Sequence, residues 1–598
     1  MAFQVSPGVL VQERDLTSII PAVSTSIGAV AGQFTKGPLD EIVSISSEQE
    51  LVETFGKPDV NNFEYFFSAA NFLQYSNTLR VVRANQTSQV NASTSGTGVL
   101  VKNTEDWTNN YASGGAAGNA TFVAREAGAY GNTLLVATCP NAAAFEEEGA
   151  TTVNDASTTV GDTAITVTAG TDLNVGDVIS FSTTAATNDY DDGEQYRVTN
   201  ISTNDLTIVQ HPRGSGGLKR TITDGANVRR RWRYYDAVDG APGTSDWTST
   251  RSGANDEIHI VVVDEDGSIS GVPGQILETY SKVSKASDAK TPQGDDNYYP
   301  NVIYTKSRYI WWTKHHSSGS NWGNAASGTT FTAVDTPSNE SLSGGSDGSA
   351  VTTGQLKTAY DKFADSETVD VGLIISGKCD STHVENLITI AEARKDCVVF
   401  ASPERADVVN VTNANTQKDN VIDFYSSISS SSYVFFDSGY KYMYDRYNDV
   451  YRYVPLNGDM AGLAARTDLI ADSWFSPAGF NRGVVRGAVK LAFNPTKTQR
   501  DELYPKRINP VATFPGQGTV LFGDKTGLAS PSAFDRINVR RLFITLEKAI
   551  ATASKFQLFE FNDEFTRANF RNIVEPFLRE VQGRRGITDF LVVCDETN

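Results

Sequence analysis

Two short motifs carry residue types that enzymes use to transfer or bind phosphate. Asp524-Lys-Thr-Gly matches the core of the sequence that is phosphorylated in ion-pumping ATPases. Those enzymes also need membrane helices and further acidic motifs, and both are missing from this sequence, so we favour a turn between strands. Ser376-Gly-Lys follows a predicted strand, as phosphate loops do, but the first glycine of that loop pattern falls at Gly372, inside the strand. We therefore predict no nucleotide site.

The residues that bind metals in other proteins have the wrong spacing here. Asp264-Glu-Asp-Gly resembles the start of a calcium loop, but the positions that need Gly and Glu hold Ile269 and Gln275. A hairpin turn is the better interpretation. His315 and His316 are adjacent, so on a strand they point to opposite faces. The four cysteines are far apart and are predicted to be buried small hydrophobic residues. We predict no metal, no cofactor and no catalytic residue.

One basic and aromatic cluster, from Arg229 to Tyr235, has side chains that can stack on nucleic-acid bases. It lies in an acidic region, because residues 140–300 hold 25 acidic and 12 basic side chains, a net charge of −13 out of −20 for the chain. We therefore favour a strand whose arginines pair with Asp236, Asp239 or the run from Asp189 to Glu194. An acidic chain is a poor candidate for wrapping nucleic acid, so no nucleic-acid partner is predicted.

The predicted secondary structure that positions these residues varies along the first half of the chain. Residues 5–13 contain strand formers without a partner strand nearby and are predicted to be an extended arm. Residues 48–55 and 64–75 have helical periodicity, and residues 79–83 read as a strand. From 141 to 250 the chain is rich in Thr, Asn, Asp and Gly with short alternating strands, which predicts an all-β insertion.

The second half alternates between helical and strand patterns. Residues 353–364 and 383–395 are predicted helices, and residues 369–375 and 397–401 are predicted buried strands. A strand, a helix and a second strand in this order form a β-α-β unit. Such a unit predicts a parallel sheet with a right-handed crossover.

The last 63 residues are the most regular part of the sequence, with nearly balanced charge. Apolar residues from Val539 to Ile550 recur at helical spacing. Asn562 is the predicted N-cap of a second helix, and Pro576 within it is expected to kink it or end it early. Ile587–Cys594 is predicted to be a strand.

These patterns predict an α+β / α/β multidomain protein, because 598 residues are too many for one core. It has a β-α-β core sheet domain, a C-terminal α/β domain and an all-β inserted domain on the outer surface. The predicted parts are an N-terminal extended arm at 1–22, a middle domain at 23–140 with 251–350, an inserted β-rich surface domain at 141–250, a main α/β domain at 351–535 and a C-terminal assembly domain at 536–598.

No apolar run approaches the roughly 20 residues of a membrane helix, so no membrane insertion is predicted. The first 20 residues carry Glu13, Arg14 and Asp15, where a signal peptide needs an uninterrupted apolar stretch. We therefore expect the protein to be made in a cytoplasm.

A series of short motifs then occurs in a fixed order and leaves out residues 141–250. The motifs are Ser6-Pro-Gly-Val, Phe55-Gly, Phe72-Leu-Gln-Tyr, Leu79-Arg-Val-Val-Arg-Ala, Gly128-Ala-Tyr-Gly-Asn, Leu342-Ser-Gly-Gly-Ser-Asp-Gly, Tyr444-Asp-Arg-Tyr-Asn-Asp-Val, Ala461-Gly-Leu-Ala-Ala-Arg-Thr-Asp, Trp474-Phe-Ser-Pro-Ala-Gly, Phe534-Asp-Arg-Ile-Asn-Val-Arg-Arg-Leu-Phe and Val592-Val-Cys-Asp-Glu-Thr-Asn. In this order they resemble the tail sheath proteins of contractile-tailed bacteriophages of the myovirus type.

The resemblance implies a structural subunit without enzymatic activity. Such subunits polymerise as stacked hexameric rings, a helical sheath around an inner tail tube, and contract to drive the tube through the host envelope. The implied partners are further copies of the chain, the inner tail tube protein, the baseplate and the tail terminator. The implied location is the virion tail, after assembly in the host cytoplasm. The alternative is a β-rich virion surface protein or host-binding protein.

In such sheaths, extended terminal strands add to a sheet in a neighbour's C-terminal domain. The candidates for this inter-subunit arm are Val5, Val9, Leu10 and Val11. The alternative is a strand folded onto its own domain. The candidates for a surface that faces the tube are Arg567, Arg571, Arg584 and Arg585. Their alternative is an ordinary solvated helix face. The resemblance also implies a further C-terminal strand and arm, which this sequence does not contain.

Overall fold

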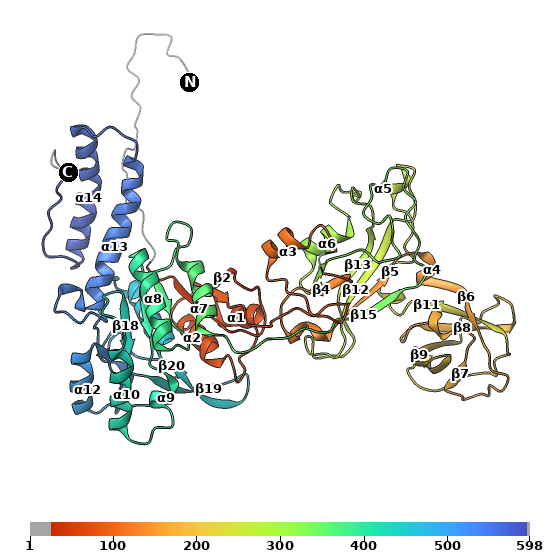
Figure 1. The fold of residues 1–598 in the computed structure, drawn as a ribbon, viewed down its shortest axis with the longest axis horizontal. Coiled ribbons are helices and arrows are strands. Elements are labelled where there is room, and N and C mark those ends of the chain that lie inside the picture. The colour runs from red at the N-terminus through yellow and green to blue at the C-terminus, as the bar shows by residue number, and fades with distance from the viewer. Residues whose placement is uncertain (1–24, 116, 595–598) are drawn as a thin grey trace, which may run out of the picture. The chain divides into compact units, whose positions relative to one another are not determined.

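The computed structural model describes residues 25–594 except residue 116. The described chain divides into two compact units, and the colours of Figure 1 separate them by residue number. Unit 1 consists of residues 25–34, 40–85 and 350–594, and unit 2 consists of residues 35–39 and 86–349. None of the helices in these ranges is long and apolar enough to cross a membrane.

Unit 1 is built on a seven-stranded sheet in the order β2-β3-β1-β16-β17-β18-β22. All neighbouring strands are parallel except β2, which is antiparallel to β3. The predicted β-α-β unit is confirmed, because β16 and β17 pair in parallel. The strands are β1 (Gly28–Gly32), β2 (Ile42–Ile45), β3 (Leu79–Arg83), β16 (Leu373–Ile375), β17 (Val398–Ala401), β18 (Val434–Asp437) and β22 (Ile508–Asn509).

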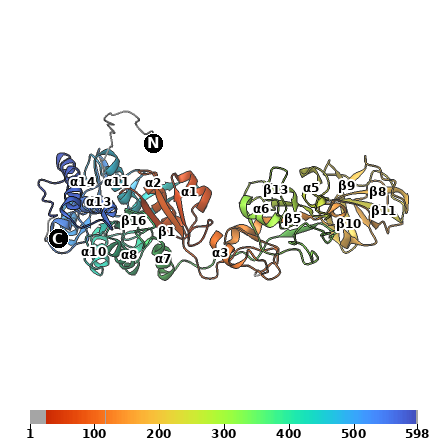
Figure 2. The ribbon, with the colours of Figure 1, turned by 90° about the horizontal axis from the view of Figure 1, so that it is seen from above.

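Helices cover both faces of this sheet, which explains why its strands are apolar runs without alternation. Figure 2 shows α2 (Phe63–Leu73) and α11 (Asn457–Ile470) on one side, and α7 (Thr353–Tyr360) and α8 (Ser381–Arg394) on the other. The approach of α2 is close enough to require glycine in β1. A Cβ on Gly28 would lie 2.6 Å from Phe72, and one on Gly32 would lie 2.5 Å from Tyr65.

Smaller elements complete the body of unit 1. A three-stranded sheet has the order β20-β19-β21, and β23 and β24 form a hairpin. These strands are β19 (Tyr440–Asp445), β20 (Val450–Pro455), β21 (Lys490–Leu491), β23 (Val511–Phe514) and β24 (Gly518–Leu521). The remaining short helices are α1 (Glu48–Phe55), α9 (Arg405–Val408), α10 (Ala414–Ser426), α12 (Lys497–Leu503), η4 (Asp361–Phe363), η5 (Tyr504–Lys506), η6 (Ala533–Asp535) and η7 (Lys555–Gln557).

The C-terminal part of unit 1 is a pair of helices, α13 (Ile537–Ser554) and α14 (Glu564–Gly583). The predicted N-cap was wrong, and the proline does not end the helix early. The N-cap of α14 is Asp563, whose carboxylate accepts from the amide of Thr566, whereas Asn562 instead accepts from Arg567. The helix also continues through Pro576.

The packing of α14 explains why it tolerates this proline. Val574, Leu578 and Val581 of α14 are buried against Leu542 and Leu546 of α13. A buried aliphatic side chain contributes about 1.5–3 kcal/mol, so several of them offset the roughly 3 kcal/mol that proline costs inside a helix.

Unit 2 contains a four-stranded sheet in the order β13-β12-β5-β15 and a two-stranded sheet of β14 and β4. The predicted hairpin at Asp264 is confirmed, because β12 and β13 are antiparallel neighbours. The elements are β4 (Phe122–Ala124), β5 (Leu134–Cys139), β12 (Glu257–Asp264), β13 (Gln275–Ser284), β14 (Ile310–Trp312), β15 (Ser338–Ser341), α3 (Thr104–Asn110), α5 (Asp246–Ser249), α6 (Tyr299–Lys306) and η1 (Ala129–Thr133).

A six-stranded sheet follows within unit 2, in the order β6-β11-β8-β9-β10-β7, with its own apolar core. All its neighbouring strands are antiparallel. Buried positions alternate with more exposed ones along parts of β9 and β10, whereas β8 begins with five consecutive buried residues. Its elements are α4 (Ala142–Phe145), β6 (Glu146–Thr152), β7 (Ala164–Thr166), β8 (Val178–Ala185), β9 (Gln195–Ser202), β10 (Asp205–His211), β11 (Ala226–Arg231), η2 (Gly170–Asp172) and η3 (Tyr235–Ala237).

Candidate assembly surfaces

The first described residue, Thr25, contacts α11. The arm candidates Val5, Val9, Leu10 and Val11 lie outside the described residues, which begin at Thr25. The hydroxyl of Thr25 donates to Oδ2 of Asp468 at 2.6 Å. The guanidinium of Arg541, in α13, donates to the same oxygen at 2.6 Å and is nearly fully buried. One carboxylate therefore holds both the start of the described chain and the C-terminal helix pair.

Sequence reasoning did not find this connection. Asp468 and Arg541 are each part of a motif that contributed to the resemblance, but they are 73 residues apart. Thr25 and Asp468 are 443 residues apart. No periodicity links positions so distant, so the sequence alone carries no signal for this pair.

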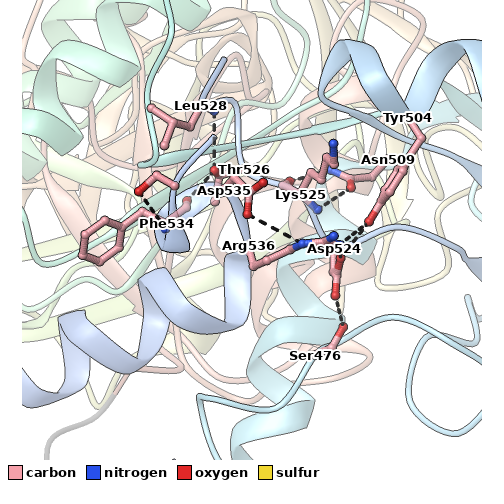
Figure 3. A network of polar contacts seen from close by, with 11 residues as sticks. Ser476, Tyr504, Asn509, Asp524, Lys525, Thr526, Leu528, Phe534, Asp535 and Arg536 are labelled. Carbon is pink, nitrogen blue, oxygen red and sulfur yellow. Dashed lines mark hydrogen bonds and ion pairs between the residues drawn. The ribbon is translucent and has the colours of Figure 1, made fainter. Parts of the chain in front are cut away.

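A second polar network fixes the beginning of α13 (Figure 3). The carboxylate of Asp524 accepts from the phenol of Tyr504 at 2.9 Å, from Arg536 at 2.6 Å and from the hydroxyl of Ser476 at 3.2 Å. Burial, followed by the charge of Asp524, raises the pKa of Tyr504 to about 12.

The location of Asp524 corrects one prediction. Its motif does not join two strands but leads from β24 to η6 and α13. Asp524 accepts hydrogen bonds from three side chains, one of which is the cation Arg536. These contacts fix the position at which α13 begins.

The segment after α14 corrects a second prediction. Ile587–Cys594 is not a strand, because no described segment pairs with it in a β-ladder. It is tied to α14 by hydrogen bonds from Gln582 to the carbonyl of Thr588 (2.7 Å) and from Arg571 to the carbonyl of Cys594 (2.5 Å). Phe590 and Val592 pack on the helix pair, while Leu591 is 86% exposed.

The structural reason is that a strand needs a partner. The segment keeps the two-residue alternation of a half-buried strand, since neighbouring side chains face the helices and the solvent in turn.

The four arginine candidates have different surroundings. Arg571 holds the carbonyl of Cys594, and Arg584 pairs with Asp472 at 2.5 Å and lies over the ring of Trp474. Arg567 donates to the side chain of Asn562 at 2.8 Å. Arg585 follows the last turn of α14 with a φ of 66° and is exposed. Two of the four thus brace the helix pair, and Arg567 and Arg585 contribute less to its internal contacts.

The body of unit 1 contains a fully buried ion pair. Nζ of Lys441 in β19 lies 2.9 Å from Oδ1 of Asp459 in α11, and both side chains are inaccessible to solvent. The phenol of Tyr75, just after α2, donates to the same oxygen at 3.0 Å. Burial raises the pKa of Asp459 and lowers the pKa of Lys441. The contact links three elements and favours movement of this body as one piece.

The arginine cluster of the six-stranded sheet pairs with carboxylates, as favoured. Arg229 pairs with Asp192, within the predicted acidic run. The other partners were not foreseen, since Arg230 pairs with Glu147 at 2.8 Å and Arg231 with Glu146 at 2.9 Å. These carboxylates come from β6, which is adjacent to β11 in the sheet. The cluster therefore links the neighbouring strands β6 and β11.

The other residues with chemical side chains are also held in structural contacts. Ser376, after β16, contacts the amide of Asn457 at 3.0 Å. His315 contacts the phenols of Tyr298 and Tyr299, and burial lowers its pKa to about 4. Among residues 25–594 without residue 116, no group of three or more His, Cys, Asp or Glu side chains is placed to hold a metal ion.

Comparison with known families gives three matches. Residues 25–84 match the family described as the tail sheath protein Gp18 domain III N-terminal region, and residues 349–527 match the phage tail sheath protein central domain. Residues 529–598 match the phage tail sheath C-terminal domain. The three matches fall in unit 1 and leave out nearly all of unit 2.

Relatives are similar over almost the whole chain. The tail sheath protein of Enterobacteria phage T4 is 33% identical over 99% of this chain and 92% of its own length. The tail sheath protein of Vibrio phage KVP40 is 32% identical over 99% of this chain and 93% of its own length.

Solved structures give weaker likenesses. The sheath tail protein of Desulfitobacterium hafniense has 11% identity over 98% of this chain and 91% of that chain, with a TM-score of 0.46. The contracted sheath complex of an extracellular contractile injection system has 21% identity over 40% of this chain and 62% of that chain, with a TM-score of 0.33. The sequence relationships to the two phage proteins are decisive, and the chain belongs to the phage tail sheath protein family.

Proposed function

We propose that this chain is a structural subunit that polymerises as stacked hexameric rings around an inner tail tube. Contraction of the resulting sheath drives the tube through the host envelope. Membership in the tail sheath family is the single observation that carries this proposal. The baseplate, the tail terminator and the tube protein are its proposed partners, and the virion tail is its location after assembly in the host cytoplasm.

The joint between neighbouring copies is proposed to be strand addition. Val5, Val9, Leu10 and Val11 form the donor arm, which adds to a sheet in a neighbour's C-terminal domain. Four backbone hydrogen bonds of about 0.5–1.5 kcal/mol each hold such a joint with roughly 2–6 kcal/mol. The contacts of Asp468 support this proposal, because a load on the arm reaches α11 and α13 through Thr25 and Arg541.

Contraction is proposed to consume no nucleotide. The subunits re-dock as rigid bodies while the terminal joints keep them connected. About 200 Å² of additional apolar burial per subunit releases roughly 5 kcal/mol at about 25 cal/mol per Å², before the costs of docking. The buried pair of Lys441 and Asp459 supports rigid-body movement, because separating the two would leave a charge without a partner.

The inner tube is proposed to contact the C-terminal helix pair through Arg567, Arg571, Arg584 and Arg585. The support is their placement along α14 and at its end. Arg567 and Arg585 are better suited to direct contact, since Arg571 and Arg584 already bind groups of their own chain.

Negative-stain microscopy of purified full-length protein tests the proposal. We expect ordered tubes or polysheath, and we expect deletion of residues 1–14 to abolish them. Leu10→Pro removes one backbone donor from the arm and should also prevent assembly, whereas Leu10→Val keeps the backbone and should assemble. Normal assembly of the deletion variant would refute the donor arm, and the absence of tubes from the unsubstituted chain would refute the sheath function.

A further inference from the structure

The turn between α13 and α14 exposes an unusual amount of apolar surface. Five large apolar side chains within ten residues are each between 62% and 106% exposed. This tip cluster consists of Phe556, Leu558, Phe559, Phe561 and Phe565. With ~150–250 Å² for each aromatic side chain, its apolar area is on the order of several hundred Å². Patches of that size on soluble proteins mark interaction sites.

The backbone of the turn holds one of these rings outward. Phe559 has a φ of 70°, in the left-handed region that bulky side chains rarely adopt. Strain of this kind persists where a function requires it. The ten residues 556–565 also contain Glu560, Asp563 and Glu564 and no lysine or arginine. The tip is therefore both apolar and acidic.

A second exposed aromatic cluster lies elsewhere in unit 1. The rings of Phe480, Phe514 and Phe522 form a triangle with centroid separations of 5.2–5.9 Å. Phe480 and Phe522 are 45% and 44% exposed. The guanidinium of Arg500, in α12, lies over two of these rings. This aromatic patch is apolar and basic.

The tip cluster and the aromatic patch are too far apart to meet within one molecule. Figure 1 shows α12, which carries Arg500, and the turn between α13 and α14 toward opposite ends of unit 1. Two different complementary surfaces on one chain make a head-to-tail contact between copies. A head-to-tail contact leaves one free surface of each kind, so it can repeat from copy to copy and build a ring or a helix. A symmetric contact uses the same surface on both copies and ends at a dimer.

We propose that the tip cluster of one copy docks on the aromatic patch of a second copy of this chain. The aromatic rings supply the apolar contact, and Glu560 and its acidic neighbours face Arg500. This contact rests on the proposed sheath function and adds to it a specific interface between subunits, separate from the terminal arms. The area is below the ~800 Å² per partner of a stable two-protein interface, so it acts as one of several contacts in the lattice.

Disulfide trapping in assembled tubes tests this interface. Cys594→Ser removes the half-buried thiol, and the other three cysteines are buried. In that background, Phe559→Cys and Phe522→Cys are combined in one chain, and the tubes are oxidised. We expect a ladder of covalent multimers on a non-reducing gel. Each single variant, and a matched control that combines Phe559→Cys with Leu469→Cys, should give at least tenfold less multimer, because Leu469 is exposed but outside the patch.

A second measurement uses the assembly threshold. Phe559→Ser with Phe561→Ser should raise the protein concentration needed for tubes at least tenfold, while Val160→Ser, an exposed position in unit 2, should not. Arg500→Glu should weaken assembly, and adding Glu560→Arg should restore it. Tubes without the ladder, or normal assembly of the double serine variant, overturn this interface alone. Failure of the unsubstituted chain to form tubes overturns the sheath function and this interface with it.

Discussion

The central sheet of unit 1 and the six-stranded sheet of unit 2 solve the problem of burial in different ways. The first is almost wholly parallel, with apolar strands between two layers of helices and a buried ion pair at its side. The second is antiparallel, and its charged pairs reach solvent. The three family matches cover the first and omit the second. From this contrast we expect assembly to depend on unit 1, and the six-stranded sheet to fold around a core of its own.

The largest difference in stability should come from the buried pair of unit 1. Lys441→Met leaves the carboxylate of Asp459 fully buried without its cation, which costs about 3–5 kcal/mol. Hydrogen exchange should accelerate in peptides of β16–β18 and stay unchanged in β8–β10. As a matched control, Lys357→Met removes an exposed pair with Asp361 and should cost less than about 1 kcal/mol. Equal exchange in both variants would contradict the rigid-body role of the pair.

Replacing the buried Arg230 of unit 2 should reduce stability less than replacing Lys441 of unit 1. Arg230 is fully buried and binds Glu147 and three backbone carbonyls, but the side chain of Glu147 is 35% exposed. Arg230→Met therefore leaves no buried charge without a partner. We expect the free energy of unfolding to fall by about 1–3 kcal/mol, because the backbone carbonyls lose their donor. Urea unfolding followed by hydrogen exchange in β6 and β11 measures it. A decrease in the free energy of unfolding as large as that of Lys441→Met would contradict the difference between the two sheets.

A smaller effect is the pH dependence of unit 1. Asp437, at the end of β18, lies 2.7 Å from the hydroxyl of Ser402, and burial raises its pKa to about 8. Between about pH 4 and pH 8 the folded state therefore binds one more proton at this site than the unfolded state. Its contribution to the free energy of unfolding falls as pH rises through that window, by about 1.4 kcal/mol per pH unit.

Asp437→Asn should remove this component, because the amide does not titrate. Calorimetric unfolding of both proteins at several pH values between 4 and 8 gives the comparison. The variant should show a flatter dependence of stability on pH. Identical slopes for the two proteins would mean that the carboxyl is ionised in the folded state.

The smallest expected effect on assembly is that of removing the six-stranded sheet. Glu146 and Arg231 are register partners in neighbouring strands, so residues 147–230 can be replaced by a short Gly-Ser turn. We expect tubes of unchanged helical repeat in negative stain, since the excised strands carry their own core. A chain in which residues 147–230 are kept but Arg229 is replaced by Met serves as a control for damage at the junction. Loss of tubes only in the excised chain would place the sheet in the lattice.

The parts of the fold that were predictable depend on local signals. Helix α1 was predicted at its observed residues 48–55, and the strands of the β-α-β unit were visible as short apolar runs. Pro576 does not end α14, because its local penalty is offset by packing on α13. Ile587–Cys594 misled because its strand pattern depends on a partner that the described chain does not supply.

The candidate site was less predictable for the same reason. The arginines of α14 were visible as a charged face, but their partners Asp472 and the carbonyl of Cys594 are set by tertiary contacts. The exposed rings of residues 556–565 look like core residues in the sequence, because an aromatic residue at a helix end is usually buried. Only the three-dimensional structure shows that they face outward.

A helical reconstruction of tubes grown from the purified full-length chain tests the central claim most directly. The claim is that copies are joined through unit 1 and that the six-stranded sheet of unit 2 stays outside the lattice. We predict repeating contacts between copies of unit 1 at every lattice point, with the strands β6–β11 at the outer radius. A reconstruction in which copies of unit 1 do not touch one another, or in which the six-stranded sheets form the lattice, would contradict it.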